Sequence, residues 1–426
     1  MRAYLTTVDW SRRLLLLLWL LAGLLIALQI APRLGDGSWL NRTGLGDTVL
    51  LNGVRVDWEW IDVAQTALLA EGDRRWPDRG SGFLLTQSAS RFIPGLVDSW
   101  LMLWTRDLWR AAAVAIWLCW FIAAGAMYAL GRALIPDSER GRIIGIVAAG
   151  FVVFSTGFTS FINHIDTQPF SYTAVVVALL AMQRSAVFGR SSASAVVPSQ
   201  VFRHVLALTL VLFIADATEN VGPPLIGMMW LFYVGLNGGT SDLSLIARAR
   251  RAALVTTGFI GLQACWWLVV QAVVLGQVKS HNEPIQHIAE FVARIGDWQW
   301  LEYVQFSIEN ITMAHAAPVV FLFVPGLIFL PRRAALWALA WVVIIVLGIT
   351  VTRSLPRTAY FTYPALYLAA AAAAEGLGRL AVPRWQRWHP KLMRWLIPMT
   401  VVGINAWVLL GDLRGDLTQA QRWFSG

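Results

Sequence analysis

The stretch AALWALAWVVIIVLGITV, residues 334–351, runs for 18 residues without a charged side chain. Arg332 and Arg333 precede it, and Arg353 follows closely. The hydrocarbon core of a bilayer is about 30 Å thick, so a helix needs roughly 20 apolar residues to cross it. The stretch therefore predicts a helix that spans a membrane.

Similar runs recur along the chain, which has 426 residues, 57% of them hydrophobic and only 14% charged. In soluble domains about a quarter of the residues are charged. We expect an all-α polytopic membrane protein that forms a single membrane domain, residues 1–426, with about eleven transmembrane helices. The spans are predicted near residues 14–31, 109–131, 143–162, 170–188, 204–217, 221–236, 252–274, 316–330, 334–351, 359–377 and 395–411. The spans 204–217 and 221–236 are short, and we expect them to form a tight hairpin that does not cross fully.

The positive charge indicates orientation. The chain has 34 Lys and Arg residues, only two of which, Lys279 and Lys391, are lysine. The arginines cluster in alternate connections between the runs, as cytoplasmic loops do. This predicts a cytoplasmic N-terminus, an outer C-terminus and contact with anionic lipids rather than nucleic acid. The scarcity of lysine is typical of a GC-rich bacterial genome, hence of a bacterial inner membrane.

Two outer connections are long, residues 32–107 and 277–315. Connections of this length are usually functional. Helical spacing of apolar residues predicts two amphipathic helices in the first of them, one within residues 54–73 and one near residues 91–104. Their tryptophans suit helices that lie in the membrane interface. No soluble domain is expected after the last span.

Several acidic residues lie in connections that are predicted to be on the outer side of the membrane. Asp57, Glu59 and Asp62 fall within six residues, and Asp166 lies in the short connection before the fourth span. Helix capping accounts for some of them, because acids favour helix N-termini. Glu59 and Asp62 are assigned mostly to capping and solvation, with Glu59 kept as a candidate substrate contact.

Four segments, in this order, resemble the GT-C superfamily of polyprenyl-phosphate-dependent glycosyltransferases. Within it the chain is most similar to the protein-mannosyltransferase-like and lipid A aminoarabinose transferase-like group. The segments are VDWEWIDVAQTALLAEG (56–72), SRFIPGL (90–96), HIDTQPFSYTAVVVALLAM (164–182) and RTAYFTYPALYLAAAAAAEGL (357–377).

The resemblance implies an enzyme that moves a sugar from a polyprenyl-phosphate carrier, such as an undecaprenyl lipid, to an acceptor at the periplasmic face. It puts Asp57 in the place of the catalytic acid and Asp166 in the place of the second acid. Arg91 stands for a lysine that members carry, and Arg357 and Tyr360 match an Arg-Tyr-Pro pattern. Ser90 stands where members often have a metal-binding acid.

The chemistry of such a transfer can be argued from the residues as well. A base must take the acceptor's proton, and cations must hold the charge that develops on the leaving phosphate. Arg91, Arg353 and Arg357 are the outer arginines nearest predicted membrane ends, and the guanidinium group matches phosphate oxygens. For Arg353 and Arg357 the alternative is interfacial anchoring.

A divalent cation is a further expectation. Asp166, His281 and Glu283 are candidate ligands, and a site rich in oxygen ligands favours magnesium or manganese. A hydrogen bond between a loop histidine and an acid is the alternative for His281.

Two other functions remain open from the sequence. One is a transporter or flippase of a lipid-linked or polar substrate, which would place charges and broken helices near mid-membrane. The other is a non-catalytic membrane assembly subunit. The sugar and the acceptor, whether lipid, glycan or protein, are not specified.

Overall fold

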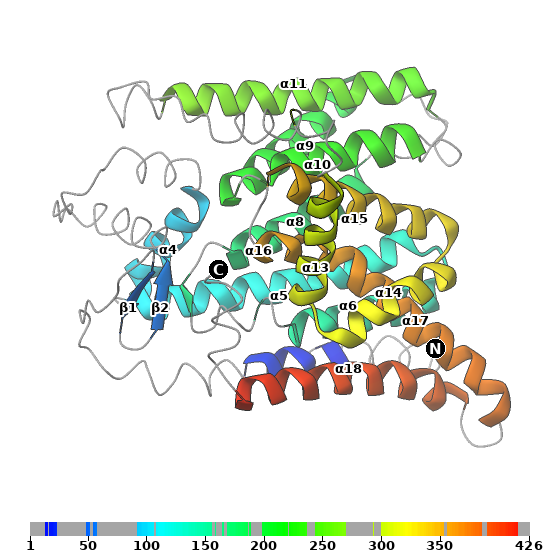
Figure 1. The fold of residues 1–426 in the computed structure, drawn as a ribbon. Coiled ribbons are helices and arrows are strands. Elements are labelled where there is room, and N and C mark those ends of the chain that lie inside the picture. The colour runs from blue at the N-terminus through cyan, green and yellow to red at the C-terminus, as the bar shows by residue number, and fades with distance from the viewer. Residues whose placement is uncertain are drawn as a thin grey trace, which may run out of the picture.

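The fold is nearly all helical, with one small sheet (Figure 1). The computed structural model describes residues 13–15, 17–23, 48–51, 54–57, 92–105, 108–155, 158, 164–165, 168–185, 187–188, 198–219, 221–236, 243–269, 293, 300–352, 356–385 and 390–415. The longer helices are α4 (Phe92–Thr105), α5 (Leu108–Leu134), α6 (Ser138–Val153), α8 (Gln168–Arg184), α9 (Pro198–Glu219), α11 (Leu245–Val269), α13 (Trp300–Ala314), α14 (Ala317–Phe329), α15 (Arg332–Thr352), α17 (Tyr363–Trp385) and α18 (Pro390–Gly415). The short ones are α10 (Gly222–Met228), which continues as the π-helix η3 (Met229–Leu236), and α16 (Pro356–Ala359), followed by the 3-10 turn η6 (Tyr360–Thr362).

The helices occupy the predicted spans. By length and apolar composition, four of the described helices can cross a membrane, namely Val114–Leu134, Gln200–Glu219, Leu245–Val269 and Arg332–Val351. Counting the bent pair α13–α14 as one span raises the number to five. The helices at the other predicted positions are shorter or more polar, so the prediction of about eleven spans stays a prediction. In the expected hairpin, α9 is longer than its apolar run and has the length and composition to cross, whereas Gly222–Leu236 is a shorter apolar helix. That the hairpin does not cross fully stays a prediction.

Helix α17 forms the centre of the bundle. Its residues Tyr363–Ala374 are all buried, and six of them are the alanines 369–374. Small residues let helix backbones approach closely in membrane proteins. A Cβ added at Gly326 of α14 would lie 2.0 Å from the Ala369 carbonyl oxygen, so only glycine fits there. The polyalanine run thus serves close packing of α14 on α17.

The outward side of the bundle is apolar. Large hydrophobic side chains are exposed along α9 (Leu210, Ile214), α11 (Leu254, Ile260) and α15 (Leu347). Exposed large apolar side chains of this kind mark contact with a membrane or a partner. With the apolar helices, it describes a multi-pass membrane protein.

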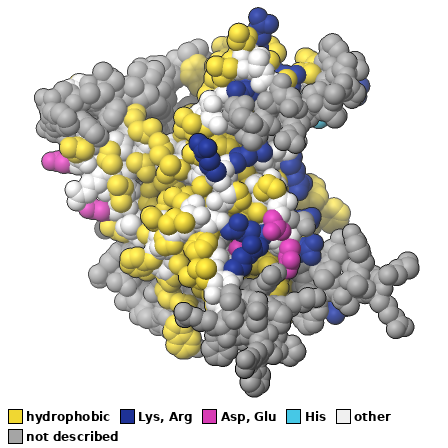
Figure 2. Space-filling view, turned by 90° about the vertical axis from the view of Figure 1, so that its right-hand side faces the viewer, with side chains coloured by type: hydrophobic (Ala, Val, Ile, Leu, Met, Phe, Trp, Pro, Cys, Tyr) yellow, Lys and Arg dark blue, Asp and Glu magenta, His cyan; other side chains and the backbone are white. Residues whose placement is uncertain are grey.

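Basic side chains gather at one end of the bundle, where α5, α14 and α17 end and α6 and α15 begin (Figure 2). The arginine clusters of the sequence supply these basic side chains, because each cluster lies at a helix terminus at this end of the bundle. The end with α4 and the sheet is the opposite one (Figure 1). The clustering agrees with the alternation of arginines read from the sequence.

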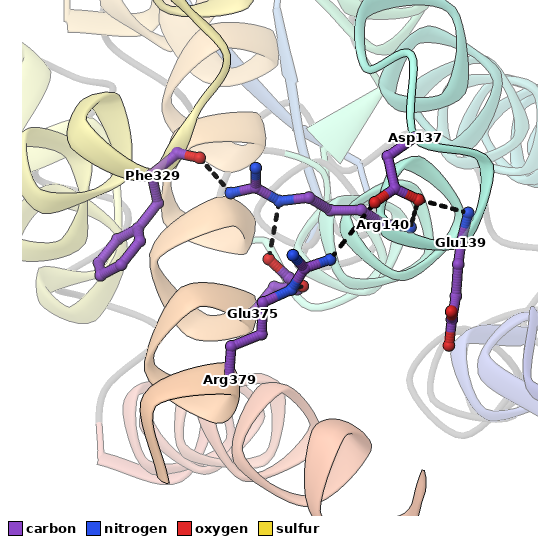
Figure 3. A network of polar contacts seen from close by, with 6 residues as sticks. All are labelled: Asp137, Glu139, Arg140, Phe329, Glu375 and Arg379. Atoms are coloured by element: carbon purple, nitrogen blue, oxygen red, sulfur yellow. Dashed lines mark hydrogen bonds and ion pairs between the residues drawn. The ribbon is translucent and has the colours of Figure 1, made fainter. Parts of the chain in front are cut away.

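A polar network joins three helices at the basic end (Figure 3). Arg140 of α6 donates through Nε to Glu375 of α17 at 3.0 Å and through a second nitrogen to the Phe329 carbonyl at the end of α14. Glu375 also accepts from Arg379, whose Nη2 lies 3.6 Å from Asp137 Oδ2. Glu375 is buried, so Arg140 and Arg379 compensate its charge.

Asp137 begins α6 and caps it. Its side chain accepts hydrogen bonds from the backbone N–H groups of Arg140 at 3.1 Å and Glu139 at 3.0 Å. The Arg140 N–H bond contributes most to holding the pKa of Asp137 below its usual value, with the Glu139 N–H and the Arg379 charge adding to it.

The outer connections differ in part from prediction. Residues 54–57 form a strand, so the all-α expectation is corrected to a nearly all-helical fold with one small sheet. The apolar residues on which the first amphipathic helix was predicted, Ile61 to Leu69, lie outside the described residues. The second expected interfacial helix is present as the helix α4, although its place in an interface stays a prediction. The connection 277–315, read as free of spans, contains α13, which is one half of the bent pair.

Candidate functional site

A parallel strand pair links two segments on which the sequence analysis concentrated. β2 (Val54–Asp57) pairs with β3 (His164–Ile165), and Val56 lies opposite Ile165. Asp57 follows Val56 in the chain, and Asp166 follows Ile165. Adjacent strands are about 4.8 Å apart. The pairing therefore joins the chain positions directly before the two acids, which are far apart in the sequence.

The third strand explains how β2 is held. β1 (Thr48–Leu51) pairs antiparallel with β2, with Leu51 opposite Val54. The two intervening residues in the sequence are Asn52 and Gly53, and Asn-Gly between β-branched or apolar residues is the strongest short hairpin signal. The helical spacing of the apolar residues that follow, Ile61 to Leu69, obscures this signal in the sequence.

The helix that follows Asp166 begins in a polar contact with the α9–α10 turn. Gln168 and Ser171 of α8 both donate to Glu219 at the end of α9, the serine at 2.9 Å. Asp216 accepts from the backbone N–H of Gly222 at 2.6 Å and from Gln263 of α11. These bonds fix the start of α8 and give the acidic hairpin a structural role.

The turn that carries Arg357 is tied to the same helix. Arg357 lies in α16, and the next residues form η6 and the start of α17. The Tyr363 hydroxyl donates to the Tyr172 carbonyl of α8 at 2.8 Å. Trp341 of α15 donates to the Phe361 carbonyl at 2.8 Å. Two neighbouring helices therefore hold the Arg-Tyr-Pro turn.

Tyr360 is buried among aromatic rings, at 1% exposure. Its ring stacks on Tyr363, with centroids 5.1 Å apart, and on His315, with centroids 5.0 Å apart. Its hydroxyl lies 3.2 Å from that of Tyr367. In this structure Tyr360 supports the turn. Its predicted contact with substrate stays a prediction.

The other predicted site residues are not brought together by described contacts. Asp57 and Arg357 are described by their backbone alone. The predicted residues Glu59, Arg91, Asp166, His281, Glu283 and Arg353 lie outside the described residues. Within the described part of the chain, no three His, Cys, Asp or Glu residues cluster as a metal site would require. The cation prediction is thus untested, since its three candidate ligands are not described.

Comparison with known proteins finds solved structures of similar arrangement, among them the two that follow. No family model and no curated protein sequence matches the chain. One structure is an oligosaccharyltransferase from Archaeoglobus fulgidus, solved with a tethered acceptor peptide, at 11% identity and a TM-score of 0.45. The match covers 83% of this chain and 54% of the archaeal one, so the chain spans about half the length of that enzyme. The other is ArnT from Cupriavidus metallidurans in the apo state, at 14% identity and a TM-score of 0.44, covering 83% and 74% of the two chains.

Each of the two is similar to this chain in fold alone.

Proposed function

We propose that this protein is a membrane glycosyltransferase that moves a sugar from a polyprenyl-phosphate carrier to an acceptor at the outer face of a bacterial inner membrane. One observation carries the proposal: β2 pairs with β3 at the positions directly before Asp57 and Asp166. The two acids are also the ones that the resemblance puts in the places of the catalytic acid and the second acid. Their convergence on one strand pair is what a shared site requires.

In this proposal Asp57 is the general base. It takes the proton of the acceptor hydroxyl or amine as the acceptor attacks the anomeric carbon, and the bond from that carbon to the carrier phosphate breaks. Asp166 orients the acceptor or a magnesium or manganese ion beside it. A positioned base contributes about 10²- to 10⁴-fold in rate.

Arg357 binds the leaving phosphate. The Tyr363–Tyr172 hydrogen bond ties its turn to α8, the helix that begins two residues after Asp166. A guanidinium group keeps its charge and bonds two phosphate oxygens at once. The tie supports a phosphate site near the acid pair.

The basic end of the bundle supports one orientation of the protein in the membrane. Cytoplasmic connections carry the excess of Lys and Arg, which puts the end drawn in Figure 2 in the cytoplasm and the sheet outside. The N-terminus is then cytoplasmic and the C-terminus outside. An acceptor would reach the acids from the periplasm, while the carrier stays in the bilayer.

A transporter or flippase is the second candidate, and the broken pair α13–α14, bent by 113°, favours it. Discontinuous helices often form transport sites. The buried Asp216 weighs against it, because Gly222 and Gln263 already bind both carboxylate oxygens.

The test is sugar transfer by purified full-length protein in lipid nanodiscs, supplied with polyprenyl-phosphate sugars and cell-envelope acceptors. Asp57→Asn keeps the size of the side chain and should reduce transfer at least 100-fold without loss of folding, as expected for a lost base. Asp137→Asn at the opposite end is the matched control and should keep parental transfer. Parental transfer by Asp57→Asn would refute the assignment of the base. Movement of a labelled carrier between leaflets, with no transfer by the parent protein, would favour the transporter.

A further inference from the structure

The break between α13 and α14 is polar on its buried side. His315 lies in the break, and Ser307 and Asn310 lie on the buried face of α13. The side chains of Asn310 and His315 are 3% and 4% exposed. Apolar residues would suffice to pack a helix there, and buried polar residues in a membrane protein are costly and usually functional.

Two polar atoms at this break have no hydrogen-bond partner among the described residues: Nδ2 of Asn310 and Nδ1 of His315. The neighbouring groups are paired, since the Ser307 hydroxyl lies 3.0 Å from that of Thr350. Buried polar atoms are rarely left unpaired, because each loses its bond to water. The pairing of the neighbours shows that the local geometry permits hydrogen bonding, so the two unpaired atoms call for a ligand.

The hydrogen bonds also indicate whether each unpaired atom is a donor or an acceptor. His315 Nε2 lies 2.9 Å from the Thr362 hydroxyl, which donates to the Ala359 carbonyl at 2.7 Å, and on this ground we assign the imidazole proton to Nε2. A neutral imidazole with its proton on Nε2 has an acceptor at Nδ1. Asn310 Nδ2 is a donor. The break thus offers one acceptor and one donor.

The ligand that fits them is neutral. No ion pair involves either residue, and no charged side chain hydrogen-bonds to either one, within the described part of the chain. A phosphate would call for charged donors. A hydroxyl group both donates and accepts, as these two atoms require.

This break adjoins the turn of Arg357. α13 packs against α16 and η6, and the His315 ring stacks on Tyr360. A carrier phosphate at Arg357 would place its sugar close to the turn.

We propose that Asn310 and His315 bind hydroxyl groups of the transferred sugar, as a subsite for the neutral part of the donor. The subsite rests on the proposed function, because it assumes a sugar-bearing carrier at Arg357. It selects sugar-bearing over sugar-free carriers, whereas Arg357 binds the phosphate common to both.

Two variants separate ligand binding from packing. Asn310→Leu keeps the side-chain volume and removes the unpaired amide. His315→Gln retains a donor near the position of Nε2 for Thr362 and removes Nδ1. His315→Asn is the matched control, because it keeps a polar group near the Nδ1 position and loses the bond to Thr362.

The experiment measures melting temperature and carrier binding for the full-length protein in nanodiscs. The probes are decaprenyl phosphate alone and decaprenyl phosphate bearing one hexose or one pentose. Without carrier, Asn310→Leu should melt above the parent, because a buried unpaired group is removed. Both Asn310→Leu and His315→Gln should bind the sugar-bearing carrier about tenfold more weakly, the value of a hydrogen bond of ordinary strength. Their affinity for the sugar-free carrier should equal that of the parent.

His315→Asn should melt below the parent yet keep more of the preference for the sugar than His315→Gln. Unchanged sugar preference in both Asn310→Leu and His315→Gln, with carriers binding normally, would overturn the subsite and leave the proposed function standing. Failure of the parent to bind any carrier would overturn both. A lower melting temperature for Asn310→Leu would show that the amide is paired in the protein and would also overturn the subsite.

Discussion

The hydroxyl of Tyr363 donates to the backbone carbonyl of Tyr172 at 2.8 Å, across 191 residues of sequence. Tyr363 follows the turn that carries Arg357, and Tyr172 lies in the first turns of the helix that follows Asp166. One hydrogen bond therefore couples the expected phosphate-binding turn to the segment of the second acid.

Removing this bond should cost a measurable amount of stability. Tyr363→Phe keeps the ring, which stacks on Tyr360, and removes only the hydroxyl. We expect a loss of about 1 kcal/mol in the free energy of unfolding, measured by thermal melting in detergent. Tyr128→Phe is the control, since no hydrogen bond of the Tyr128 hydroxyl is described. Equal melting of the two variants would show that the Tyr363–Tyr172 bond adds nothing.

Close packing of α14 on α17 gives a second prediction. At Gly326 an added Cβ would overlap the Ala369 carbonyl, whereas at Gly403 of α18 nothing lies within 4 Å. Gly326→Ala should destabilise the protein by about 3 kcal/mol, the upper end of the usual cost of overpacking, because the overlap is with backbone. Gly403→Ala should stabilise it by about 0.5–1 kcal/mol, because alanine favours a helix. Yield of folded protein and melting temperature report both effects. Similar stabilities for the two alanine variants would contradict the close helix contact.

A third prediction concerns the ion pair between Arg140 and the buried Glu375. Glu375→Gln leaves Arg140 without its charged partner and should cost about 3 kcal/mol, since breaking a buried pair leaves an uncompensated charge. Arg140→Met combined with Glu375→Gln should cost less than the sum of the two single changes, because either single change already breaks the pair, while Arg379 keeps Asp137 at 3.6 Å. A double-mutant cycle by melting measures the coupling. Additive effects would mean that the pair does not interact.

The capping carboxylate Asp137, at the same end of the bundle, should make the stability of the protein depend on pH. Its folded pKa is depressed, first by the Arg140 backbone N–H. A carboxylate of this kind stabilises the fold above its unfolded pKa, and the contribution is lost as pH falls through the folded value. The melting temperature of the parent should therefore fall between about pH 5 and pH 3 by more than that of Asp137→Asn, which cannot ionise. Parallel curves for the two proteins would contradict the capping interaction.

The sequence predicted the helices well because hydropathy and arginine clusters follow directly from the cost of burying charge. The strand at Val54–Asp57 was missed because four residues are too short for periodicity, and only Asn52–Gly53 signalled it. The β2–β3 pairing has no local signature, since it joins segments far apart. His315 belongs to none of the motifs in the sequence, and its meaning appears only when its unpaired nitrogen is seen against Thr362 and Tyr360.

The last prediction concerns Arg357, which the proposal assigns to the carrier phosphate. Arg357→Lys keeps the charge and loses the planar fork that bonds two oxygens. If Arg357 makes such a bidentate contact, the variant should bind decaprenyl phosphate about tenfold more weakly, because one charge-assisted hydrogen bond contributes roughly 1.5–3 kcal/mol. Interfacial anchoring needs only a long basic side chain, so an anchor would tolerate lysine without loss. Arg203→Lys, an exposed arginine near the start of α9 at the basic end, is the matched control and should bind the carrier as the parent does. Parental affinity in Arg357→Lys together with normal melting would make Arg357 an anchor and leave the phosphate to another arginine of the outer connections.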